Sequence, residues 1–276
     1  MNLQQAVREA TRRLAAAGSV SAAAEARTLA AWVLGTDVTR LPLIDFVTPD
    51  QSSRLDAAVD QCVAGTPVQL VTGRAYFRRV EVHVGPGVFI PRPETECLAG
   101  WAIRVIQPGV SRVVELCAGS GALSLALADE ARPGAAWAVE RSAVAYGYLT
   151  ANLDGTAVTP VHAAMAEALP ELDGGIDVVV ANPPYVPDGT ALPPAVGYDP
   201  AEALFSGPDG LDATREVAAV AYRLLKPKGV VGSEHGDDQG DAVRDIFRRA
   251  GFTDVTTHPD LTGRPRFVTA RRADVE

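Results

Sequence analysis

The chain has 276 residues and a formal net charge of −9, with 47% hydrophobic and 21% charged residues. This composition is typical of a globular protein with room for one large and one small domain. The negative charge disfavours direct binding to nucleic-acid phosphates, no apolar run approaches the ~18 residues that cross a membrane, and the first residues lack a signal-peptide core. We therefore expect a cytoplasmic monomer with no nucleic-acid or membrane partner.

Periodic apolar residues in the first part of the chain predict helices. Hydrophobic residues recur at helical spacing before Gly18, again before Gly35, and a third time between the capping box Thr48-Pro49-Asp50-Gln51 and Gly65. Capping boxes begin helices, and glycine commonly ends them. Residues 1–65 are thus expected to form a small helical bundle, which on these residues alone is a structural cap.

A connector and a β-hairpin are predicted for residues 66–92. Residues 66–73 read as a linker. Alternate valines at 80–84, the turn Gly85-Pro86-Gly87 and the apolar run 88–90 are typical of two paired strands. We expect this hairpin to join the bundle to the rest of the chain.

Residues 93–276 alternate between apolar strands and helical segments. Alternation of this kind specifies a parallel sheet with helices on both faces, the α/β class of fold. The expected strands lie near 112–117, 136–140, 158–162, 176–182 and 229–234. The expected helices lie at 96–106 and near 122–130, 142–153, 209–225 and 240–250.

A glycine turn follows the first of these strands. In Glu115-Leu116-Cys117-Ala118-Gly119-Ser120-Gly121 the glycines allow close approach to a ligand, and the helix that follows begins with unpaired N–H groups. Glu140 ends the next strand about 20 residues later, where nucleotide-binding folds hold an acid for ribose hydroxyls. A plain strand-to-helix turn is the alternative. The chain lacks a third glycine at dinucleotide spacing and a Gly-Lys-Ser/Thr sequence, so NAD and P-loop phosphate sites are disfavoured.

The tetrapeptide Asn182-Pro183-Pro184-Tyr185 follows the apolar run Val178-Val179-Val180-Ala181. The Asn182 side-chain oxygen and the Pro183 carbonyl can accept both hydrogens of a planar amide or amino nitrogen. That grip draws the nitrogen lone pair out of conjugation and aims it at an electrophile. The prolines stiffen the loop, and Tyr185 adds an aromatic face and a hydroxyl. A proline-rich turn that closes a strand is the alternative interpretation.

The glycine turn, Glu140 and Asn-Pro-Pro-Tyr, in this order, resemble the class I methyltransferases that use S-adenosylmethionine. Further segments are similar to the signature of the PrmC/HemK family: Phe89-Ile90-Pro91-Arg92-Pro93-Glu94-Thr95-Glu96, Asp199-Pro200-Ala201-Glu202-Ala203-Leu204, Gly207-Pro208-Asp209-Gly210-Leu211, Glu234-His235-Gly236, Gln239-Gly240 and Gly263-Arg264-Pro265-Arg266-Phe267. The resemblance covers nearly the whole chain. It implies a Rossmann-like, mostly parallel seven-stranded sheet whose closing strands, near 255–257 and 267–270, include one antiparallel strand.

The resemblance also implies the reaction. The family methylates the side-chain amide nitrogen (N5) of the glutamine in the Gly-Gly-Gln motif of class I peptide-chain release factors. The cofactor would be S-adenosyl-L-methionine, with S-adenosyl-L-homocysteine as product. Residues 1–65 would hold the protein substrate, and residues 93–276 would form the catalytic domain.

A set of site residues follows from the same motifs. The expected catalytic residues are Asn182, Pro183 and Tyr185. The expected cofactor-binding residues are Cys117, Ala118, Gly119, Ser120, Gly121, Glu140, Met165 and Asn182. The expected substrate-binding residues are Asn182, Pro183, Pro184, Tyr185, Arg92 and Glu94, although the last two could instead brace the hairpin. No His, Cys or acidic cluster has metal-ligand spacing, so no metal is expected.

The chain departs from the family pattern at several positions. Glu115 and Glu140 stand where Asp is usual, and Cys117-Ala118 stands where Gly-Thr is commoner. After His162 the family often has an acid that meets the adenine amino group, but this chain has Ala163-Ala164-Met165. Adenine recognition is therefore expected to rest on backbone groups and on packing against Met165.

Other functions stay open on the residues alone. The glutamine of a ribosomal protein could be the substrate instead. An amino-methylating DNA or RNA enzyme has the same loop, but it needs a basic cleft to receive a flipped base. A non-enzyme, an inactive cofactor-binding module, is a further alternative. His235 could be a base or a ligand, or it could serve packing alone.

Overall fold

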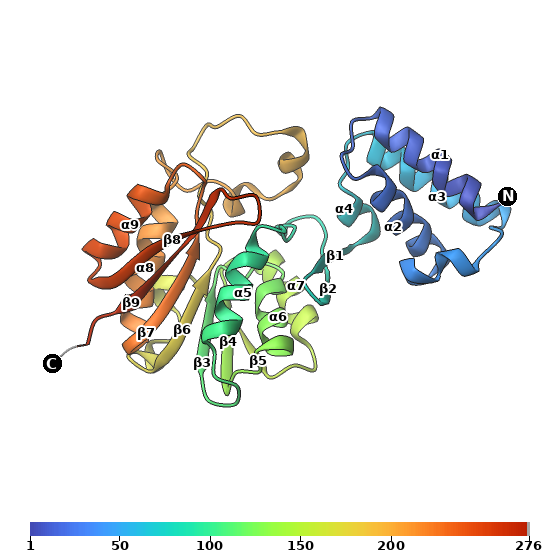
Figure 1. Cartoon of the computed structure of the whole chain (residues 1–276). Helices are drawn as coiled ribbons and strands as arrows, with labels where there is room; N and C mark the ends of the chain where they lie inside the picture. The colour runs from blue at the N-terminus through green and yellow to red at the C-terminus, as the bar shows by residue number, and fades with distance from the viewer. Residues whose placement is uncertain (275–276) are drawn as a thin grey trace. The chain divides into compact units, whose positions relative to one another are not determined.

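The computed structural model describes residues 1–274, which form two compact units. The helical unit contains Met1–Arg74 together with Leu192–Tyr198. The sheet unit contains Ala75–Ala191 together with the described residues from Asp199 onward. Figure 1 colours the first helices blue and the last strands red.

The helical unit is built around one hydrophobic core. Its helices are α1 (Leu3–Ala16), α2 (Ala22–Leu34), η1 (Val38–Leu43), α3 (Pro49–Val63), α4 (Val68–Thr72) and η4 (Pro194–Tyr198). The buried residues of this core include Leu3, Leu14, Leu29, Leu55 and Val59. The three helices expected before Gly65 are thus present as α1, α2 and α3.

The predicted capping box begins α3. Thr48 Oγ1 accepts the Gln51 N–H at 3.2 Å, and Gln51 Oε1 accepts the Thr48 N–H at 2.9 Å. These bonds satisfy backbone donors that the first turn of a helix leaves unpaired. Gly35 ends α2 with φ 61°, a left-handed conformation that favours glycine.

The sheet unit contains a seven-stranded sheet with the order β5-β4-β3-β6-β7-β9-β8. Its strands are β3 (Arg112–Leu116), β4 (Ala135–Glu140), β5 (Val158–His162), β6 (Ile176–Ala181), β7 (Leu225–Glu234), β8 (Phe252–Pro259) and β9 (Pro265–Arg272). Neighbouring strands are parallel except that β9 runs antiparallel to both β7 and β8. The predicted mostly parallel Rossmann-like sheet with one antiparallel closing strand is confirmed.

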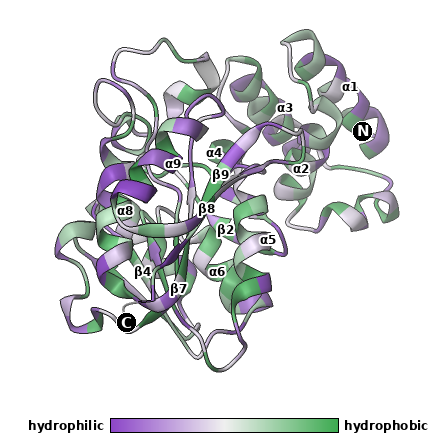
Figure 2. Cartoon of the chain, turned by 60° about the vertical axis from the view of Figure 1, so that its left-hand side comes forward, coloured by the Kyte–Doolittle hydropathy of each residue, from purple (hydrophilic) through white to green (hydrophobic). Residues whose placement is uncertain are grey.

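Helices cover both faces of this sheet. Val139 packs into a core with α8 (Asp212–Leu224) and α9 (Gly240–Arg249), whereas the adjacent Ala138 packs with α7 (Ala143–Leu153). Alternate residues of a strand point to opposite faces, so α8 and α9 lie on one face and α7 on the other. In Figure 2 α6 (Ala122–Glu130) is mostly hydrophobic, in keeping with its buried position.

The remaining long helix, α5 (Thr95–Val105), packs closely against β7. A Cβ atom at Gly232 would lie 2.5 Å from Cζ3 of Trp101, so only glycine allows this approach. The close packing holds the first residue of α5 near the ends of the central strands, which matters for the site described below.

The segment that leads into the sheet differs from the prediction. Strands β1 (Arg74–Phe77) and β2 (Val80–His83) form a two-stranded sheet, while residues 88–90 are not a strand. The turn between β1 and β2 uses Arg78 at φ 53°, which gives no glycine signal in the sequence. The N–H of Ile90 instead donates to Asp199 Oδ1 at 3.0 Å, so this segment binds a distant loop rather than β2.

The structure also shows a short helix in the predicted linker and the character of the helices in general. The predicted linker 66–73 contains α4, whose 5 residues form less than two turns and are too few to show a helical period in the sequence. Among the helices of residues 1–274, none combines the length and apolar character needed to span a bilayer.

Candidate active site

The glycine turn and the Asn-Pro-Pro-Tyr loop meet at the point where the order of the strands in the sheet reverses. The chain runs outward from β3 to β4 and β5 on one side and from β6 to β7 on the other, so β3 and β6 flank the switch point. Leu116 at the end of β3 pairs with Ala181 at the end of β6. The glycine turn and Asn182 therefore begin side by side at the carboxyl edge, where α/β sheets bind their ligands.

The glycine turn has an unusual backbone. Cys117, Gly119 and Gly121 have φ values of 59°, 55° and 81°. A Cβ at Gly121 would lie 2.7 Å from Leu149 Cδ1, so glycine is required there. Cys117 takes the left-handed conformation without being glycine, which costs roughly 1–2 kcal/mol. This strain explains physically why glycine is commoner at that position in the family pattern.

Cys117 is also a poor nucleophile. Burial raises the pKa of its thiol to about 12. The reactive form of cysteine is the thiolate, which such a pKa suppresses. Cys117 thus acts in the turn through its backbone and packing.

Glu115 lies beneath the turn and caps α6. Its side chain is buried at 3% exposure and accepts the Ser124 N–H at 2.8 Å, together with the Ser124 hydroxyl. Burial raises the pKa of Glu115 to about 8, although the bonds from Ser124 oppose the shift. The sequence showed Glu115 only as the residue that opens the turn, and it carried no signal for this cap.

Glu140 ties the turn to the end of β4. Its carboxylate is 8% exposed and accepts the Gly119 N–H at 2.9 Å and the Ser142 N–H at 2.7 Å. The Ala118 N–H donates to the Val139 carbonyl at 2.9 Å, which adds a second link. Glu140 therefore lies beside the glycine turn, and each carboxylate oxygen retains a further lone pair for a ligand.

Met165 approaches the same edge from β5. It begins the short helix η2 (Met165–Glu167) and is half-buried against the core. The Ala163 N–H donates to the Glu140 carbonyl at 3.2 Å. This bond brings the segment that contains Met165 next to the strand that carries Glu140.

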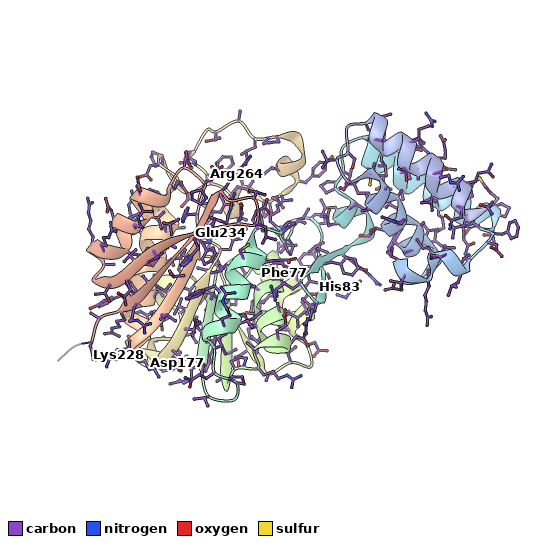
Figure 3. The ribbon with its side chains drawn as sticks, viewed as in Figure 1. Phe77, His83, Asp177, Lys228, Glu234 and Arg264 are labelled. Atoms are coloured by element: carbon purple, nitrogen blue, oxygen red, sulfur yellow. The ribbon has the colours of Figure 1, made fainter. Side chains whose placement is uncertain are left out.

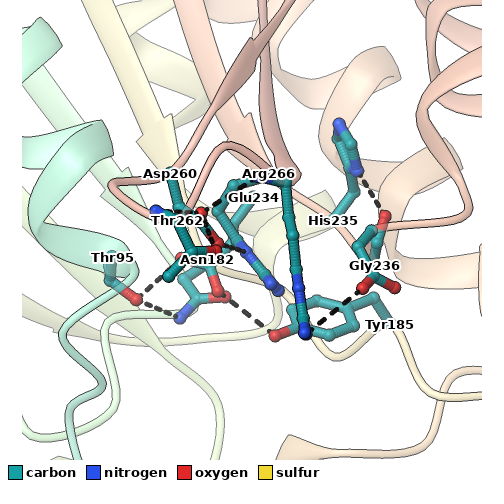
Figure 4. Close-up of polar contacts among 11 residues, drawn as sticks. Thr95, Asn182, Tyr185, Glu234, His235, Gly236, Asp260, Thr262 and Arg266 are labelled. Carbon is teal, nitrogen blue, oxygen red and sulfur yellow. Dashed lines mark hydrogen bonds and ion pairs between the residues drawn. The ribbon is translucent and has the colours of Figure 1, made fainter.

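The Asn-Pro-Pro-Tyr loop is held by polar side chains from two other elements. Asn182 Nδ2 donates to Thr95 Oγ1 at 3.2 Å, and the Tyr185 hydroxyl donates to Glu234 Oε1 at 3.2 Å (Figure 4). Pro183 is buried and Pro184 half-buried between them. Burial raises the pKa of Tyr185 above its usual value. The loop is therefore anchored at both ends.

Glu234 is the centre of these contacts. It ends β7, is 1% exposed, and also accepts the Thr95 hydroxyl on Oε2 at 2.7 Å. Burial raises the pKa of Glu234 to about 7, against the opposing effects of the Thr95 bond and the Arg266 charge. Thr95 and Glu234 both stand in segments similar to the family signature, but the sequence carries no signal for these contacts.

Gln239 is a further residue whose contacts the sequence did not indicate. Its Nε2 donates to the Tyr185 carbonyl at 2.8 Å, and its Oε1 accepts the Gly236 N–H at 2.8 Å. A Cβ at Gly210 would lie 2.4 Å from the Tyr185 carbonyl oxygen. Gln239 thus holds the backbone of the loop, and Gly210 leaves room for the Tyr185 carbonyl.

Arg92 and Glu94 lie just before α5 and play different parts. Arg92 forms an ion pair with the buried side chain of Asp199 and lies 5.2 Å from the Phe89 ring centroid. It braces its own loop against the segment that follows Asn-Pro-Pro-Tyr. Glu94 is half-buried and directly precedes Thr95, so it stands close to the network around Glu234.

His235 is shielded from solvent. Its exposure is 0%, its Nδ1 lies 2.7 Å from the Gly236 carbonyl, and Nε2 has no hydrogen-bond partner among residues 1–274. Burial lowers the pKa of His235. A neutral imidazole packed inside the sheet unit agrees with the structural alternative. In the part of the chain that the structure describes, no group of three or more His, Cys, Asp or Glu side chains could hold a metal ion.

Comparison with known proteins decides the family. Residues 5–73 match the PrmC N-terminal domain, and residues 96–199 match the methyltransferase small domain. A protein of Streptomyces coelicolor named release factor glutamine methyltransferase is 46% identical over 99% of both chains. A protein of the same name from Mycolicibacterium smegmatis is 44% identical over 98% of both chains.

The chain belongs to the release factor glutamine methyltransferase family. The family predicted from the sequence motifs is thereby confirmed. A methyltransferase from Pyrococcus furiosus shares the fold, with a TM-score of 0.50 and 14% identity over 80% of this chain and 99% of that protein. The individual site residues stay predictions, but the structure brings most of them to the carboxyl edge around β3, β4 and β6.

Proposed function

We propose that this protein transfers a methyl group from S-adenosylmethionine to the side-chain amide nitrogen of the glutamine in the Gly-Gly-Gln motif of class I release factors. The observation that carries the proposal is the anchored carboxamide of Asn182. Its Nδ2 is engaged by Thr95, which leaves Oδ1 as the free acceptor end of the group. An acceptor is what the NH2 group of a glutamine requires.

The residues around the glycine turn fit the proposed cofactor. A Cβ at Gly119 would meet no described atom within 4 Å, so the turn has an open side on which a ligand can lie close to the backbone. Glu140 stands beside it with spare lone pairs for the two ribose hydroxyls. Residues 117–121, Glu140, Met165 and Asn182 would hold the cofactor. When bound, S-adenosylmethionine supplies a sulfonium methyl group, which is already electrophilic.

The protein contributes position and orientation. An amide nitrogen is a weak nucleophile because its lone pair is shared with the carbonyl. Asn182 Oδ1 and the Pro183 carbonyl would accept its two hydrogens and favour a pyramidal nitrogen, an interaction that strengthens in the transition state. Tyr185 would pack against the planar amide of the substrate. A strong base is not needed, because the methylated and protonated amide loses its proton readily to water.

Two features support release factors as the substrate: the family to which the chain belongs, and the presence of a helical domain that precedes the catalytic domain. Curated relatives that span this chain almost fully carry that substrate in their names. We assign residues 1–65 to substrate docking, 66–92 to a connector with the hairpin, and 93–276 to catalysis. Glu94 borders the loop next to Thr95 and would meet the substrate, and Arg92 would do so from its position in the ion pair with Asp199. Such a substrate would place the protein in the cytoplasm.

The test is methylation of purified release factors. Incubation with S-adenosylmethionine should add one methyl group to the peptide that contains Gly-Gly-Gln, as read by mass spectrometry. A release factor in which that glutamine is replaced by alanine is the matched control and should gain no methyl. Ribosomal proteins and DNA should gain none under the same conditions. Methylation of a ribosomal protein but not of release factors would refute the proposed substrate.

A further inference from the structure

Two hydrogen bonds connect Glu234, at the end of β7, through Thr95 to Asn182. Asn182 Nδ2 donates to Thr95 Oγ1 at 3.2 Å, and Thr95 Oγ1 donates to Glu234 Oε2 at 2.7 Å. We propose that Thr95 and Glu234 are positioning residues that fix which end of the Asn182 carboxamide faces the substrate. This inference rests on the proposed function, because it assigns the reason why Asn182 presents an acceptor.

The direction of these hydrogen bonds follows from simple donor and acceptor counting. An ionised carboxylate only accepts hydrogen bonds, and a threonine hydroxyl has one hydrogen to give. Once Thr95 gives its hydrogen to Glu234, its oxygen can only accept on the side of Asn182. Asn182 must therefore turn its NH2 toward Thr95. Its oxygen, Oδ1, then points away from Thr95.

The opposite orientation of Asn182 is disfavoured. A carboxamide has nearly the same shape when it is turned by 180°, so shape alone does not select one orientation. In the turned state Oδ1 would face the lone pairs of Thr95 Oγ1, and a buried acceptor would lose its donor. Such a loss costs about 1–3 kcal/mol. The turned state would also present NH2 to the NH2 of a glutamine, which forms no hydrogen bond.

The surroundings keep Glu234 an acceptor toward Thr95. Thr95 is 5% exposed and Glu234 is 1% exposed, so water does not compete. The other carboxylate oxygen is occupied by the Tyr185 hydroxyl at 3.2 Å. Burial raises the pKa of Glu234 to about 7, the charge of Arg266 opposes that rise and the charge of Glu94 adds to it. Above that pKa the carboxylate is ionised and accepts from both hydroxyls.

The three residues are carried by rigid elements. Asn182 follows the last residue of β6, Glu234 is the last residue of β7, and Thr95 is the first residue of α5. Ala181 pairs with Ser233 in the parallel ladder, so Asn182 and Glu234 extend adjacent strands in register. Sites built on strands and helices hold their geometry better than sites built on loops. In Figure 4 Thr95 and Asn182 lie on one side of Glu234 and Tyr185 on the other.

The first experiment tests Thr95. Release factor methylation at pH 8 should fall about 10- to 100-fold in kcat for Thr95→Val, with KM for the release factor changed less than about 3-fold. Thr95→Ser keeps the hydroxyl and should stay within about 3-fold of the wild type. Thr214→Val is the matched control, since Thr214 is buried in α8 and its hydroxyl has no partner among the described residues. It should leave kcat unchanged, and wild-type kcat in a folded Thr95→Val protein would overturn the proposal.

The second experiment tests whether turnover depends on Glu234 as a hydrogen-bond acceptor or on its negative charge. Glu234→Leu removes every acceptor and should lower kcat about 10- to 100-fold. Glu234→Gln loses the charge but can still accept from Thr95, so it should keep at least about a tenth of the wild-type kcat. Equal loss in the two variants would overturn the proposal and point to the charge. Thr95→Val combined with Glu234→Leu should be no worse than the more damaging single variant, because both act through Asn182.

A readout without catalysis distinguishes failure of this inference from failure of the proposed function. The side-chain NH2 of Asn182, labelled with 15N, should exchange its hydrogens slowly with water in the wild type and at least about 10-fold faster in Thr95→Val and Glu234→Leu. Unchanged exchange in both variants would overturn the positioning role. A wild-type protein that methylates no release factor would refute the proposed function, and the exchange rates would still decide the inference.

Discussion

Asp177 at the amino end of the central sheet and Glu234 at its carboxyl end are carboxylates in opposite electrostatic states. Figure 3 shows Glu234 at one end and Asp177 and Lys228 at the other. At the amino end Asp177 accepts the Arg112 N–H at 2.8 Å and pairs with Lys226. Burial alone would raise its pKa, but these partners hold the pKa of Asp177 below its usual value.

At the carboxyl end two buried acids accept hydrogen bonds from neutral donors, whereas Asp260 nearby pairs with Arg266 and has a lowered pKa. Glu115 is bonded to Ser124, and Glu234 is bonded to two hydroxyls. Burial raises the pKa of Glu115 to about 8 and that of Glu234 to about 7. Strongly raised acid pKa values cluster at functional sites because ordinary folding stability does not call for them. Together with the meeting of the glycine turn and Asn182 at this edge, the raised values favour the carboxyl end as the place of binding and chemistry.

The largest effect is expected at Asn182. Asn182→Ala removes one acceptor from the reacting nitrogen, so turnover of release factor should fall by about 10²-fold or more. The free energy of unfolding should change by only ~1 kcal/mol, because a strand-end side chain has little packing to lose. Steady-state kinetics and urea unfolding measure the two quantities. Near-normal turnover in a folded variant would mean that the methyl acceptor is held elsewhere.

A smaller effect is expected at Glu140. Glu140→Ala should weaken S-adenosylmethionine binding by roughly 1.5–3 kcal/mol, through lost charge-assisted hydrogen bonds and a looser glycine turn. Isothermal calorimetry measures the affinity. Glu171→Ala, which removes an exposed glutamate of the same unit, is the control and should bind normally. Unchanged affinity in Glu140→Ala would remove Glu140 from the cofactor site.

The buried acids should also shape the pH dependence of stability. The pKa of Glu115 rises from 4.5 to about 8 on folding, so between these values the native state holds a proton that the unfolded state has lost. The free energy of unfolding must then fall as pH rises through this window. Glu115→Gln removes the titration, so urea unfolding at pH 5 and pH 8 should differ less in the variant. An equal pH difference in both proteins would contradict the raised pKa.

The smallest effect is expected at the amino end. Lys226→Ala removes the partner of Asp177, but the Lys226 side chain is 52% exposed and such pairs contribute ~0.2–1 kcal/mol. The melting temperature should fall slightly, and kcat should stay within about 2-fold of the wild type. A large loss of turnover would contradict the interpretation that the ion pair of Lys226 and Asp177 contributes to stability alone.

Local sequence patterns predicted most of the fold. Apolar periodicity, the capping box and glycines predicted the helices before Gly18, Gly35 and Gly65. Periodicity also predicted the alternation of strands and helices after residue 93. All of these signals lie in neighbouring residues. The hairpin was misplaced because Arg78 turns the chain at φ 53° without glycine, and residues 88–90 bind Asp199 instead of β2. A contact over that separation leaves no local signal.

The sequence by itself determined the family, the α/β fold and the two motifs that meet at the carboxyl edge. Their meeting follows from the parallel sheet, since successive strands end on one side. Only the tertiary structure decided which side chains orient those motifs. Thr95 begins α5, Glu234 ends β7 and Gln239 precedes α9, and their roles depend on burial and on the direction of each hydrogen bond. These quantities are set by packing across the whole unit, so no stretch of the sequence encodes them alone.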